Sequence, residues 1–554
     1  MSKLIFNRKK KSKYDNEGSA ISSASTLVTS SVIADLEGLS ITKERLERYV
    51  DEAKDKTETE LTNRARTARE NAIRKTLSSI KRSMEVDLCF VLDCTGSMES
   101  HISAVKDCIV KVTDYVTSIN PSIKIWVGFC GYRDFSDGSD RLIVSDFTDS
   151  YAMFKAYVAT ISAEGGDDAP EDVLGGLDAA VRQMNWRHGT RILLHIGDCP
   201  PHGRRYSSLE DSYPGGDPYG LTAESVLKHM ELENILYFFG RITSLTDQMV
   251  EIFRSIIGDF PVFDLEECDA ATMVDKFYKA ASSAINSSVS LTSTIGSDAR
   301  DIYTMRREKL EMNPDEPNWD RYRPQNGVVL WYRPPKTLDD LKNRKYFNKS
   351  NILYRNFIYM ISTQPFSSGT EKYAYYGLDH KSRPSKKIVI KEYLKLGGGA
   401  EKYLEVAEVS IVAYYLAAKF NEAARRIKVK KVNFLEVKVL RSSVGGTTRY
   451  YAVEERLKDG EFKRFNVNSG VIVEFHPVLE AFAHFTYTHT NRYLVVYDLQ
   501  GVEKANQFLL TDPAIHCIDS LRFGKTNLGE KGINECFLAN HKCNDICRKL
   551  KLRR

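Results

Sequence analysis

The chain has 554 residues, enough for two to four domains that each bury a core. Hydrophobic residues make up 42% and charged residues 28%, as in ordinary globular proteins, and the net charge of +5 is too small to suggest a nucleic-acid binder. No stretch approaches the ~20 apolar residues of a membrane helix, and the N-terminus lacks the apolar core of a signal peptide. We therefore expect a cytoplasmic protein that binds no nucleic acid.

Basic residues gather at both ends of the chain. Residues 1–40 are rich in Ser, Lys and Asn and predict a disordered N-terminus. The basic residues are Lys3, Arg8, Lys9, Lys10, Lys11 and Lys13 near the start, and Arg548, Lys549, Lys551, Arg553 and Arg554 at the finish. Such runs are usually solvated tails, and peripheral contact with an anionic membrane surface is the alternative.

Residues 41–84 predict one long helix. Neither Gly nor Pro occurs between Ile41 and Arg82, and charged residues alternate with well-spaced apolar ones. The apolar stripe is thin, so a single solvated helix and a coiled coil that would make a homo-oligomer both stay open.

Residues 85–265 alternate between strands and helices. Short apolar runs at 88–92, 123–128, 191–196 and 234–239 are typical of buried parallel strands. Helical periodicity lies between them, at 100–118, 152–162, 172–185 and 222–231. This order predicts an α/β domain with a doubly wound sheet.

Oxygen-bearing side chains follow two of these strands. Asp93, Thr95 and Ser97 leave the first strand at alternate positions, and Asp198 follows the strand at 191–196. Ligands of such sheets bind beyond the carboxyl ends of the strands, and a cup of carboxylate and hydroxyl oxygens suits Mg²⁺. The alternative is an Asp-rich helix cap without an ion.

The Asp93-x-Thr95-x-Ser97 motif, the later Asp198 and the segment 127–134 resemble the von Willebrand factor A family. The resemblance implies a metal-dependent module that binds an unknown ligand and performs no catalysis. The family often places a Thr in the middle loop, where this chain has Asp167 and Asp168 instead. An additional carboxylate would weaken the attraction of the site for an acidic ligand.

Residues 266–324 are first helical and then polar, and we interpret them as a linker. From 325 to 554, strands at 328–332, 373–377, 387–392 and 450–455 surround one helix at about 400–426. This pattern predicts an α+β domain.

The second domain holds the parts that phosphoryl transfer needs: a lysine on a strand, oxygens for a metal and a flexible loop. Lys391 closes an apolar strand, Asp498 and Gln500 follow the strand at 493–497, and Asp512 precedes a proline. Alone, each signal is weak, because strand-end lysines are usually solvated and Asp-Pro is common in turns.

His541, Cys543 and Cys547 form an H-x-C-x₃-C pattern near the C-terminus. A structural Zn²⁺ takes four nitrogen or sulfur ligands, so one more is needed. His484 is the candidate, with His489 and Cys536 as alternatives. A histidine among aromatic residues is otherwise an ordinary core residue.

Together these segments resemble the alpha-kinase family of atypical protein kinases. The matching segments are 387–393, Glu454, 462–470, 481–487, 498–502, 510–516, 523–529 and 541–549. Kinases that join such a domain to an A-type module are known from amoebae and fungi-like eukaryotes.

The resemblance implies a role for each matching residue. Lys391 contacts the ATP phosphates, Glu454 sits near adenine, Gln500 and Asp512 hold Mg²⁺, and Asp498 acts on the substrate hydroxyl or organises the metal. The loop with Gly524, Asn527 and Gly529 lies near the phosphates, and His484, His541, Cys543 and Cys547 bind a structural Zn²⁺. Lys372 stands where the family often has Arg, which keeps the charge but loses the bidentate fork.

We therefore predict a zinc-stabilised serine/threonine protein kinase that uses Mg-ATP and is recruited through its A-type module, which holds a second Mg²⁺. A helical, myosin-type tail is a substrate suggested by the family alone. One alternative is an inactive scaffold whose A-type module binds partners. Another is a purely zinc-organised recognition domain, which would leave Lys391, Asp498 and Asp512 without a task.

Overall fold

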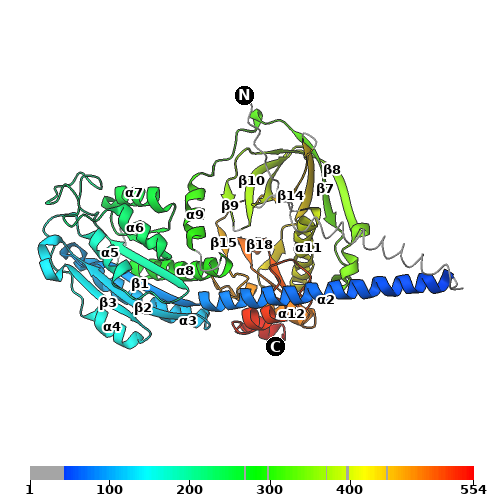
Figure 1. Ribbon diagram of the computed structural model, residues 1–554, viewed down its shortest axis with the longest axis horizontal. Helices are drawn as coiled ribbons and strands as arrows, with labels where there is room; N and C mark the ends of the chain where they lie inside the picture. Colours follow the sequence, from blue (N-terminus) through cyan, green and yellow to red (C-terminus); the bar gives the residue numbers. More distant parts are fainter. Residues whose placement is uncertain are drawn as a thin grey trace, which may run out of the picture. The chain divides into compact units, whose positions relative to one another are not determined.

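The structure is a computed structural model that describes residues 43–266, 270–295, 299–369, 371–394, 399–444, 447–458 and 460–553 (Figure 1). The predicted disordered N-terminus, 1–40, lies outside the described residues. The chain divides into two units, Met1–Ala68 and Arg69–Arg554. No helix among the described residues is long and apolar enough to cross a membrane.

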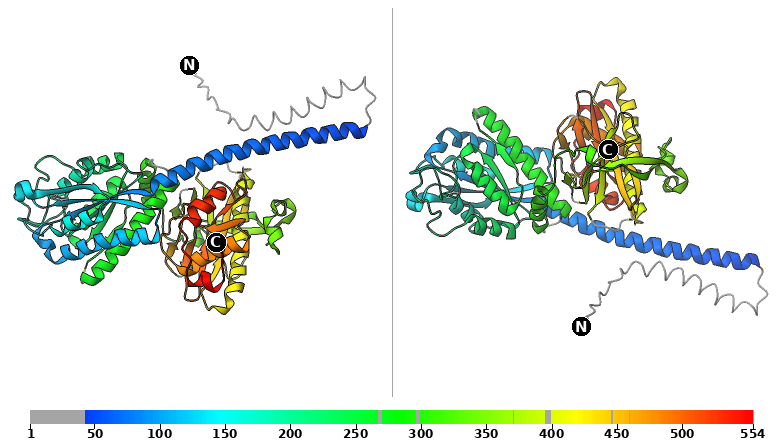
Figure 2. Two further views of the ribbon diagram at one scale, coloured as in Figure 1. Left: turned by 90° about the horizontal axis from the view of Figure 1, so that it is seen from below. Right: turned by 90° about the horizontal axis from the view of Figure 1, so that it is seen from above.

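Helix α2 (Lys43–Ser83) fills the segment that lacks Gly and Pro. It is one unbroken helix in every view (Figures 1 and 2). Among its described side chains, Leu61 is exposed, whereas Ile73, Leu77 and Ile80 nearer the C-terminal end are buried. Pairing of this helix with a second copy stays a prediction.

The α/β domain predicted at 85–265 is called the A-type domain below, after the family that it resembles. It is built on a six-stranded sheet in the order β3-β2-β1-β4-β5-β6. The strands are β1 (Glu85–Asp93), β2 (Lys124–Tyr132), β3 (Leu142–Thr148), β4 (Thr190–Gly197), β5 (Ile235–Arg241) and β6 (Val262–Asp264). Neighbouring strands are parallel except β3, which runs antiparallel to β2 at the edge. The prediction of a doubly wound sheet is confirmed, although β3 and β6 were not foreseen.

Helices cover both faces of this sheet, as Figure 1 shows. They are α3 (Glu99–Ile119), α4 (Tyr151–Ala159) and α8 (Ala270–Ile295) on one face, and α5 (Val173–Arg182), α6 (Ala223–Leu232), α7 (Asp247–Ile257) and α9 (Ala299–Leu310) on the other. Side chains of β1 alternate between the faces, so Leu88 and Phe90 join one core while Cys89 and Val91 join the other. Burial on both faces explains the continuous apolar run at 88–92.

The segment 266–324 contributes to this packing. Helix α8 buries Phe277 and Ile285 in the same core as Leu88 and Phe90. Helix α9 buries Tyr303 in the core on the opposite face. The helical part of the expected linker therefore packs as part of the α/β layers.

The second domain begins with a sheet that closes on itself. Its strand order is β11-β14-β13-β7-β8-β10-β9, and β11 also pairs with β10. The strands are β7 (Gln325–Tyr332), β8 (Ile352–Ile361), β9 (Ser367–Ser368), β10 (Lys372–Asp379), β11 (Lys386–Tyr393), β13 (Lys438–Val444) and β14 (Thr447–Glu455). Helices α10 (Leu338–Lys342) and α11 (Ala400–Ala423) accompany them. Ile388, Ile390 and Val453 are among the side chains that fill the interior of this sheet.

The rest of the second domain consists of shorter strands and helices. A four-stranded sheet holds β12 (Lys431–Phe434), β15 (Phe462–Arg464), β17 (Gln500–Glu503) and β18 (Gln507–Thr511). A separate two-stranded antiparallel sheet pairs β16 (Leu494–Tyr497) with β19 (Ala514–Cys517). The helices are α12 (Pro477–His489), α13 (Gly529–Lys531), the π-helix η8 (Gly532–Leu538) and α14 (Asp545–Lys549). Short 3₁₀ helices elsewhere are η1 (Gly96–Met98), η2 (Phe135–Arg141), η3 (Ser244–Thr246), η4 (Trp319–Arg321), η5 (Arg344–Tyr346), η6 (Lys349–Asn351) and η7 (Ala424–Arg426).

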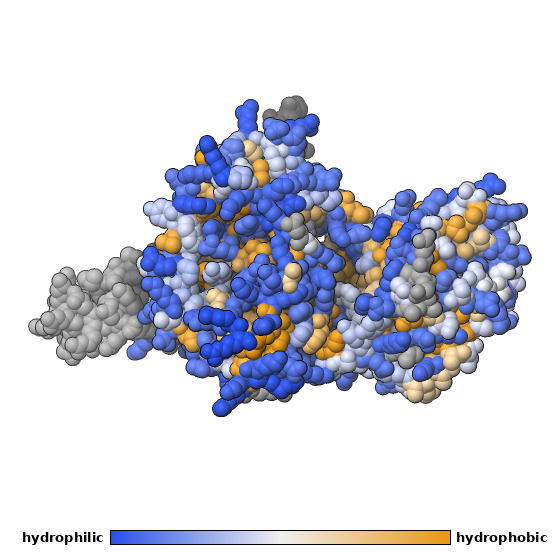
Figure 3. All heavy atoms as spheres, turned by 180° about the vertical axis from the view of Figure 1, so that it is seen from behind, coloured by the Kyte–Doolittle hydropathy of each residue, from blue (hydrophilic) through white to orange (hydrophobic). Residues whose placement is uncertain are grey.

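Hydrophilic residues predominate on the surface seen in Figure 3, and apolar residues form separate patches among them. Exposed apolar side chains scattered in this way are normal for a globular surface.

Replacing Phe277 by Ala tests whether α8 is part of the A-type core. Phe277 is fully buried, so the cavity should lower the free energy of unfolding of this domain by about 3–5 kcal/mol. Met153 on α4 is 69% exposed, and Met153→Ala should change the free energy by less than about 0.5 kcal/mol. Urea unfolding of the full chain measures the free energy of unfolding of both variants. An unchanged unfolding transition of the A-type domain in Phe277→Ala would show that α8 does not contribute to its core.

Candidate functional site

Lys391 lies at the centre of a partly buried ion cluster in the second domain, in which Asp512 keeps 32% of its side chain exposed. Its ammonium is 2.5 Å from Glu454 Oε1 and also pairs with Asp512, and only 11% of its side chain is exposed. Strand β11 carries the lysine, the neighbouring β14 carries Glu454, and Asp512 follows β18. The Thr511 hydroxyl donates to the other oxygen of Glu454. The structure thus brings together three residues that the sequence placed far apart.

The charged groups of this cluster shift the pKa values of one another. Burial alone would lower the pKa of Lys391, but Asp512 and Glu454 raise it above its ordinary value. Burial alone would raise the pKa of Asp512, but Lys391 and the more distant Lys372 hold it well below its usual range. Lys372 Nζ lies 3.8 Å from Asp512 Oδ1. The lysine therefore stays charged and the aspartate stays ionised at neutral pH.

Asp498 and Gln500 lie beside Asp512. The Gln500 side-chain amide donates to the Asp512 carbonyl oxygen at 3.2 Å, and Arg464 donates to Gln500 Oε1 at 3.0 Å. Arg464 also approaches Asp498 Oδ1, at 3.8 Å. Burial raises the pKa of Asp498 to about 6, against the lowering effect of Arg464. Asp498 Oδ1 is buried and has no hydrogen-bond donor, so it faces the site with an unused acceptor.

Three more lysines lie near this centre. Lys372 and Lys402 both approach the ring of Tyr393, at 5.2 and 3.7 Å from its centroid. Burial and then the proximity of Lys525 and Lys372 lower the pKa of Lys402. Lys525 Nζ pairs with Glu371 Oε1 at 2.5 Å, so Glu371 offsets part of the positive charge that gathers here. Lys402 and Lys525 were not predicted as site residues, because a single lysine forms no recognisable sequence motif.

The loop at 524–529 is held by its own asparagine. Asn527 is fully buried, and its amide donates to the carbonyls of Asp519 and Arg522, each at 2.8 Å. Its oxygen accepts from the backbone N–H groups of Cys517 and Gly529. Gly524 and Gly529 have φ values of 71° and 67°, which residues with a side chain rarely adopt. All four hydrogen-bonding positions of the Asn527 amide are used within the chain.

Arg69, near the middle of α2, reaches the same loop. Its guanidinium donates to the carbonyl oxygens of Ser520 at 3.3 Å, Gly524 at 3.2 Å and Lys525 at 2.9 Å, and to that of Asn527. Burial lowers the pKa of Arg69. Nothing in the sequence indicated this contact, since Arg69 is one of many charged residues on a solvent-rich helix.

The four predicted zinc ligands lie together. Ligand atoms of His484, His541, Cys543 and Cys547 are all within 4.8 Å of one another. His541 Nε2 is 3.1 Å from His484 Nδ1, and Cys547 Sγ is 3.8 Å from His541 Nε2. A zinc tetrahedron with Zn–N near 2.05 Å and Zn–S near 2.3 Å has N–N and N–S edges of about 3.3 and 3.6 Å. The donor set and its spacing therefore fit Zn²⁺.

A buried polar chain links this cluster to the Asp498 turn. Glu480 Oε2 lies 3.6 Å from His541 Nδ1, and Asn466 donates to Glu480 Oε1 at 3.1 Å. The Asn466 oxygen accepts from the backbone N–H of Leu499 at 2.8 Å. A carboxylate behind a metal-binding histidine is a common way to orient the ring. Leu499 stands between Asp498 and Gln500, so the zinc cluster and the turn share one support.

The cup predicted in the A-type domain is also assembled. Asp93 Oδ1 accepts from the Thr95 backbone at 3.0 Å and its hydroxyl at 2.7 Å, and the Thr95 and Ser97 hydroxyls are 3.1 Å apart. Asp93 Oδ2 and Asp198 Oδ1 are buried without hydrogen-bond partners. Burial and then Asp198 raise the pKa of Asp93 to about 7. Two such oxygens close together fit a cation.

Glu171 is a further carboxylate that the sequence reasoning missed. It is 2% exposed, and burial followed by the charges of Asp93 and Asp134 raises its pKa to about 10. It lies in the middle loop, three residues after the acidic pair Asp167 and Asp168.

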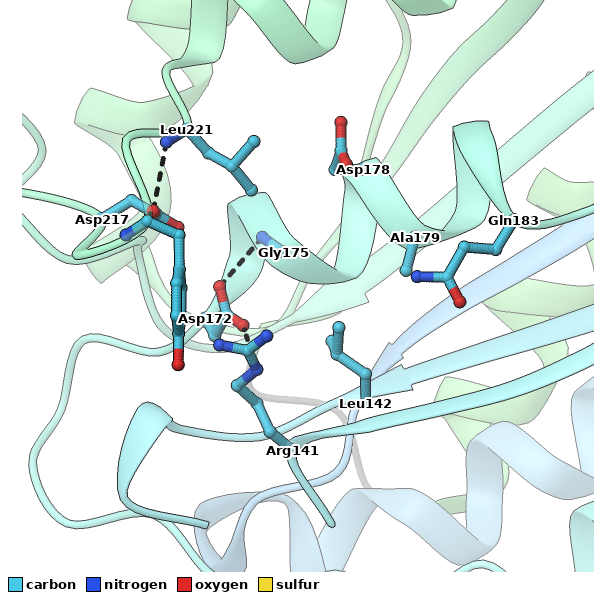
Figure 4. A pocket seen from close by; sticks show the side chains of 10 residues that line it. Arg141, Leu142, Asp172, Gly175, Asp178, Ala179, Gln183, Asp217 and Leu221 are labelled. Atoms are coloured by element: carbon cyan, nitrogen blue, oxygen red, sulfur yellow. Dashed lines mark hydrogen bonds and ion pairs between the residues drawn. The ribbon is translucent and has the colours of Figure 1, made fainter. Parts of the chain in front are cut away.

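A small pocket opens beside this region, between β3, α5 and the loop at 217–221 (Figure 4). Arg141 and Asp172 pair inside it at 3.1 Å, and Asp172 accepts from the Gly175 backbone at 2.9 Å. Burial raises the pKa of Asp172 to about 7, although Arg141 acts to lower it. The paired lining charges hold η2, β3 and α5 together.

Two family models match the chain: the alpha-kinase family over residues 367–547 and the von Willebrand factor A domain over 87–192. The alpha-protein kinase vwkA of Dictyostelium discoideum is 32% identical over 503 residues, which are 87% of this chain and 79% of that protein. Myosin heavy chain kinase B of the same organism is 33% identical over 189 residues, 34% of this chain and 25% of that kinase. A solved alpha kinase from Entamoeba histolytica, 29% identical, aligns with 43% of this chain and 94% of its own, with a TM-score of 0.37.

Substituting Asn466 tests the support under the Asp498 turn. Asn466→Ala leaves the Leu499 N–H and the Glu480 carboxylate without a buried partner, which should cost about 2–4 kcal/mol of unfolding free energy. Asn466→Asp keeps the acceptor for Leu499 but places a charge beside Glu480, so it should not restore stability. Denaturant unfolding of the full chain measures the effect. Wild-type stability in both variants would contradict the proposed support.

Proposed function

This chain belongs to the alpha-kinase family and is a protein kinase, and we propose that it transfers the γ-phosphoryl group of ATP to serine or threonine hydroxyls at the site around Lys391. The observation that carries this proposal is the buried Lys391 held between Glu454 and Asp512. A lysine fixed by a carboxylate, beside a second carboxylate and an amide, supplies the charges that phosphoryl transfer requires.

Lys391 binds the phosphates of ATP in this proposal. Its ammonium stays charged and is too constrained by Glu454 to move freely, so it is positioned before the nucleotide arrives. Glu454 thus orients the lysine from β14, in addition to its expected place near adenine. Lys372, Lys402 and Lys525 add positive charge around the same centre.

Asp512 and Gln500 would hold Mg²⁺, and their oxygens fit this ion's preference. Asp498 Oδ1 beside them accepts no hydrogen bond, and Arg464 approaches it no nearer than 3.8 Å, so this acceptor can still bind a metal or a hydroxyl. Bound Mg²⁺ supplies neutralisation of charge on the phosphate oxygens. Asp498 accepts the hydrogen bond of the substrate hydroxyl and can take its proton.

The loop at 524–529 shapes the entrance to the site. Because the amide of Asn527 is fully used within the chain, we propose that Asn527 holds the loop while Gly524 and the Lys525 side chain face the phosphates. Arg69 fixes the carbonyl groups of the loop from α2, and the N–H groups of Asn527, Leu528 and Gly529 are bonded within the chain, so the loop is held on both sides.

The zinc cluster has a structural role in this proposal, since all four positions are filled by protein. The A-type cup of Asp93, Thr95, Ser97 and Asp198 would hold a separate Mg²⁺ and serve to recruit a partner. A helical, myosin-type tail is the substrate class that the name of the related myosin heavy chain kinase B suggests.

Phosphate transfer from labelled Mg-ATP tests the proposed site. Wild type should label itself, a basic generic substrate and a myosin-type helical tail, whereas Lys391→Ala and Asp512→Ala should lose at least about 3 kcal/mol of transition-state stabilisation, or about a hundredfold in rate. Lys387→Ala is the matched control, because Lys387 lies on the same strand with 46% of its side chain exposed.

No transfer by folded, zinc-loaded wild type to any of these substrates would contradict the proposed phosphoryl transfer. The chain would then be a scaffold whose A-type module is the functional part. Transfer that survives in Lys391→Ala would keep the kinase but refute the assigned residues.

Zinc analysis after gel filtration tests the C-terminal cluster. Cys547→Ser should lose the bound zinc and unfold the C-terminal part of the domain at lower denaturant, because binding of structural zinc contributes directly to folding. Cys536→Ser and His489→Asn replace the two alternative ligands and should retain zinc. Equal zinc content in all four proteins would refute this ligand set.

A further inference from the structure

A second group of possible ligands lies in the A-type domain, outside the Asp93 cup. Ligand atoms of Asp134, Asp168 and His202 are all within 4.8 Å of one another. Asp134 caps η2 after β2, Asp168 lies in the loop before α5, and His202 lies in the loop after β4. Three loops at the same edge of the sheet therefore converge on one point, where the Asp134 and His202 side chains are each 1% exposed.

The His202 ring is oriented from both sides. Its Nδ1 is 2.8 Å from Asp211 Oδ1, and Asp211 is itself fixed by the backbone N–H groups of Gly203 and Tyr213, both at 2.7 Å. The rings of Phe135 and Tyr213 enclose the imidazole, each with its centroid 5.1 Å away. A carboxylate behind one ring nitrogen, with the other nitrogen directed at further ligands, is the usual arrangement around a metal-binding histidine.

The remaining ligand atoms fit a shared ion. His202 Nε2 is 2.8 Å from Asp134 Oδ1. Two adjacent ligands of a six-coordinate ion with bonds of about 2.1 Å are about 3 Å apart, close to this distance. A protonated His202 bridging Asp134 and Asp211 would explain these two contacts equally well, so the pair alone does not decide between an ion and a salt bridge.

Asp168 distinguishes the two explanations. Its Oδ2 accepts from the Ser212 backbone at 2.5 Å, but its Oδ1 is buried and has no donor. Histidine protonation leaves Asp168 Oδ1 unsatisfied, whereas a cation bound by Asp134, Asp168 and His202 would satisfy it. Glu171 is 2% exposed and interacts with the charges of both Asp93 and Asp134.

We propose that Asp134, Asp168 and His202 form a second cation site in the A-type domain, with Glu171 between it and the Asp93 cup. One imidazole and two carboxylates favour a divalent transition ion such as Mn²⁺ over Mg²⁺, which prefers oxygen ligands alone. The ion would tie η2 to the loops at 163–172 and 199–213. Asp137 of η2 already accepts from the Gly166 backbone at 3.1 Å, so this ion would also set the position of the loop beside the Asp93 cup.

Mn²⁺ binding to the full chain, prepared with no more than one zinc per chain so that Zn²⁺ does not compete for the site, tests the proposal by electron paramagnetic resonance. Wild type should bind one more Mn²⁺ than Asp168→Asn, or bind it at least tenfold more tightly. Asp167→Asn is the matched control, because Asp167 is the exposed neighbour in the same loop. The thermal midpoint without Mn²⁺ should not fall in Asp168→Asn, since this variant removes one negative charge from a crowded carboxylate group.

A second readout separates the two sites of the domain. The Asp93 cup has only oxygen ligands, so nitrogen coupling in the electron spin echo of bound Mn²⁺ must come from His202. This coupling should persist in Ser97→Ala, which weakens the cup, and disappear in Asp168→Asn. Absence of nitrogen coupling in wild type, or equal Mn²⁺ binding by wild type and Asp168→Asn, would overturn the proposal.

Discussion

The ion cluster of Lys391, Glu454 and Asp512 is the constraint around which the kinase domain is organised. It joins the closed sheet, through β11 and β14, to the four-stranded sheet that ends in Asp512. Removing water from three charges is costly, so such a cluster is weak evidence for stability by itself. Its value lies in position: Lys391 contacts both carboxylates, and the Gln500 amide donates to the carbonyl of Asp512, so the lysine and the Asp498 turn meet at Asp512.

The zinc cluster extends the same constraint from the opposite side. Asp498 and Asp512 both adopt positive φ values, 54° and 46°, a conformation that costs free energy for residues with a side chain. Such a turn persists only where its surroundings fix it. The hydrogen bonds from Asn466 to Glu480 and from Leu499 to Asn466 fix the backbone of the turn. The hydrogen bond from Arg464 to Gln500 fixes its side chains. The His541 cluster is thereby connected to the Asp498 turn without contacting it.

The sequence predicted those features that arise from residues close together in the chain. The apolar run at 88–92 followed by Asp93 predicts a buried strand ending in a carboxylate, and both the strand and the cup are present. The H-x-C-x₃-C spacing likewise predicts ligands on neighbouring turns. Glu171, Asn466 and Arg69 could not be found in this way, because each matters through a contact between loops far apart in the chain. The edge strand β3 was missed because it is only partly buried and its apolar run, 142–144, is only three residues long.

The A-type domain concentrates negative charge where its loops meet. Asp93, Asp198 and Glu171 are buried together, and burial with mutual repulsion raises the pKa of Asp93 to about 7 and of Glu171 to about 10. Burial of these ionised groups without a counterion is therefore unfavourable at neutral pH. A cation would relieve the repulsion, but the three carboxylates would neutralise its charge from within the domain. We infer that such a cation serves chiefly to hold the loops, and that an acidic partner would gain little by coordinating it. Partner recognition would then fall to the surface of the loops that the cation positions.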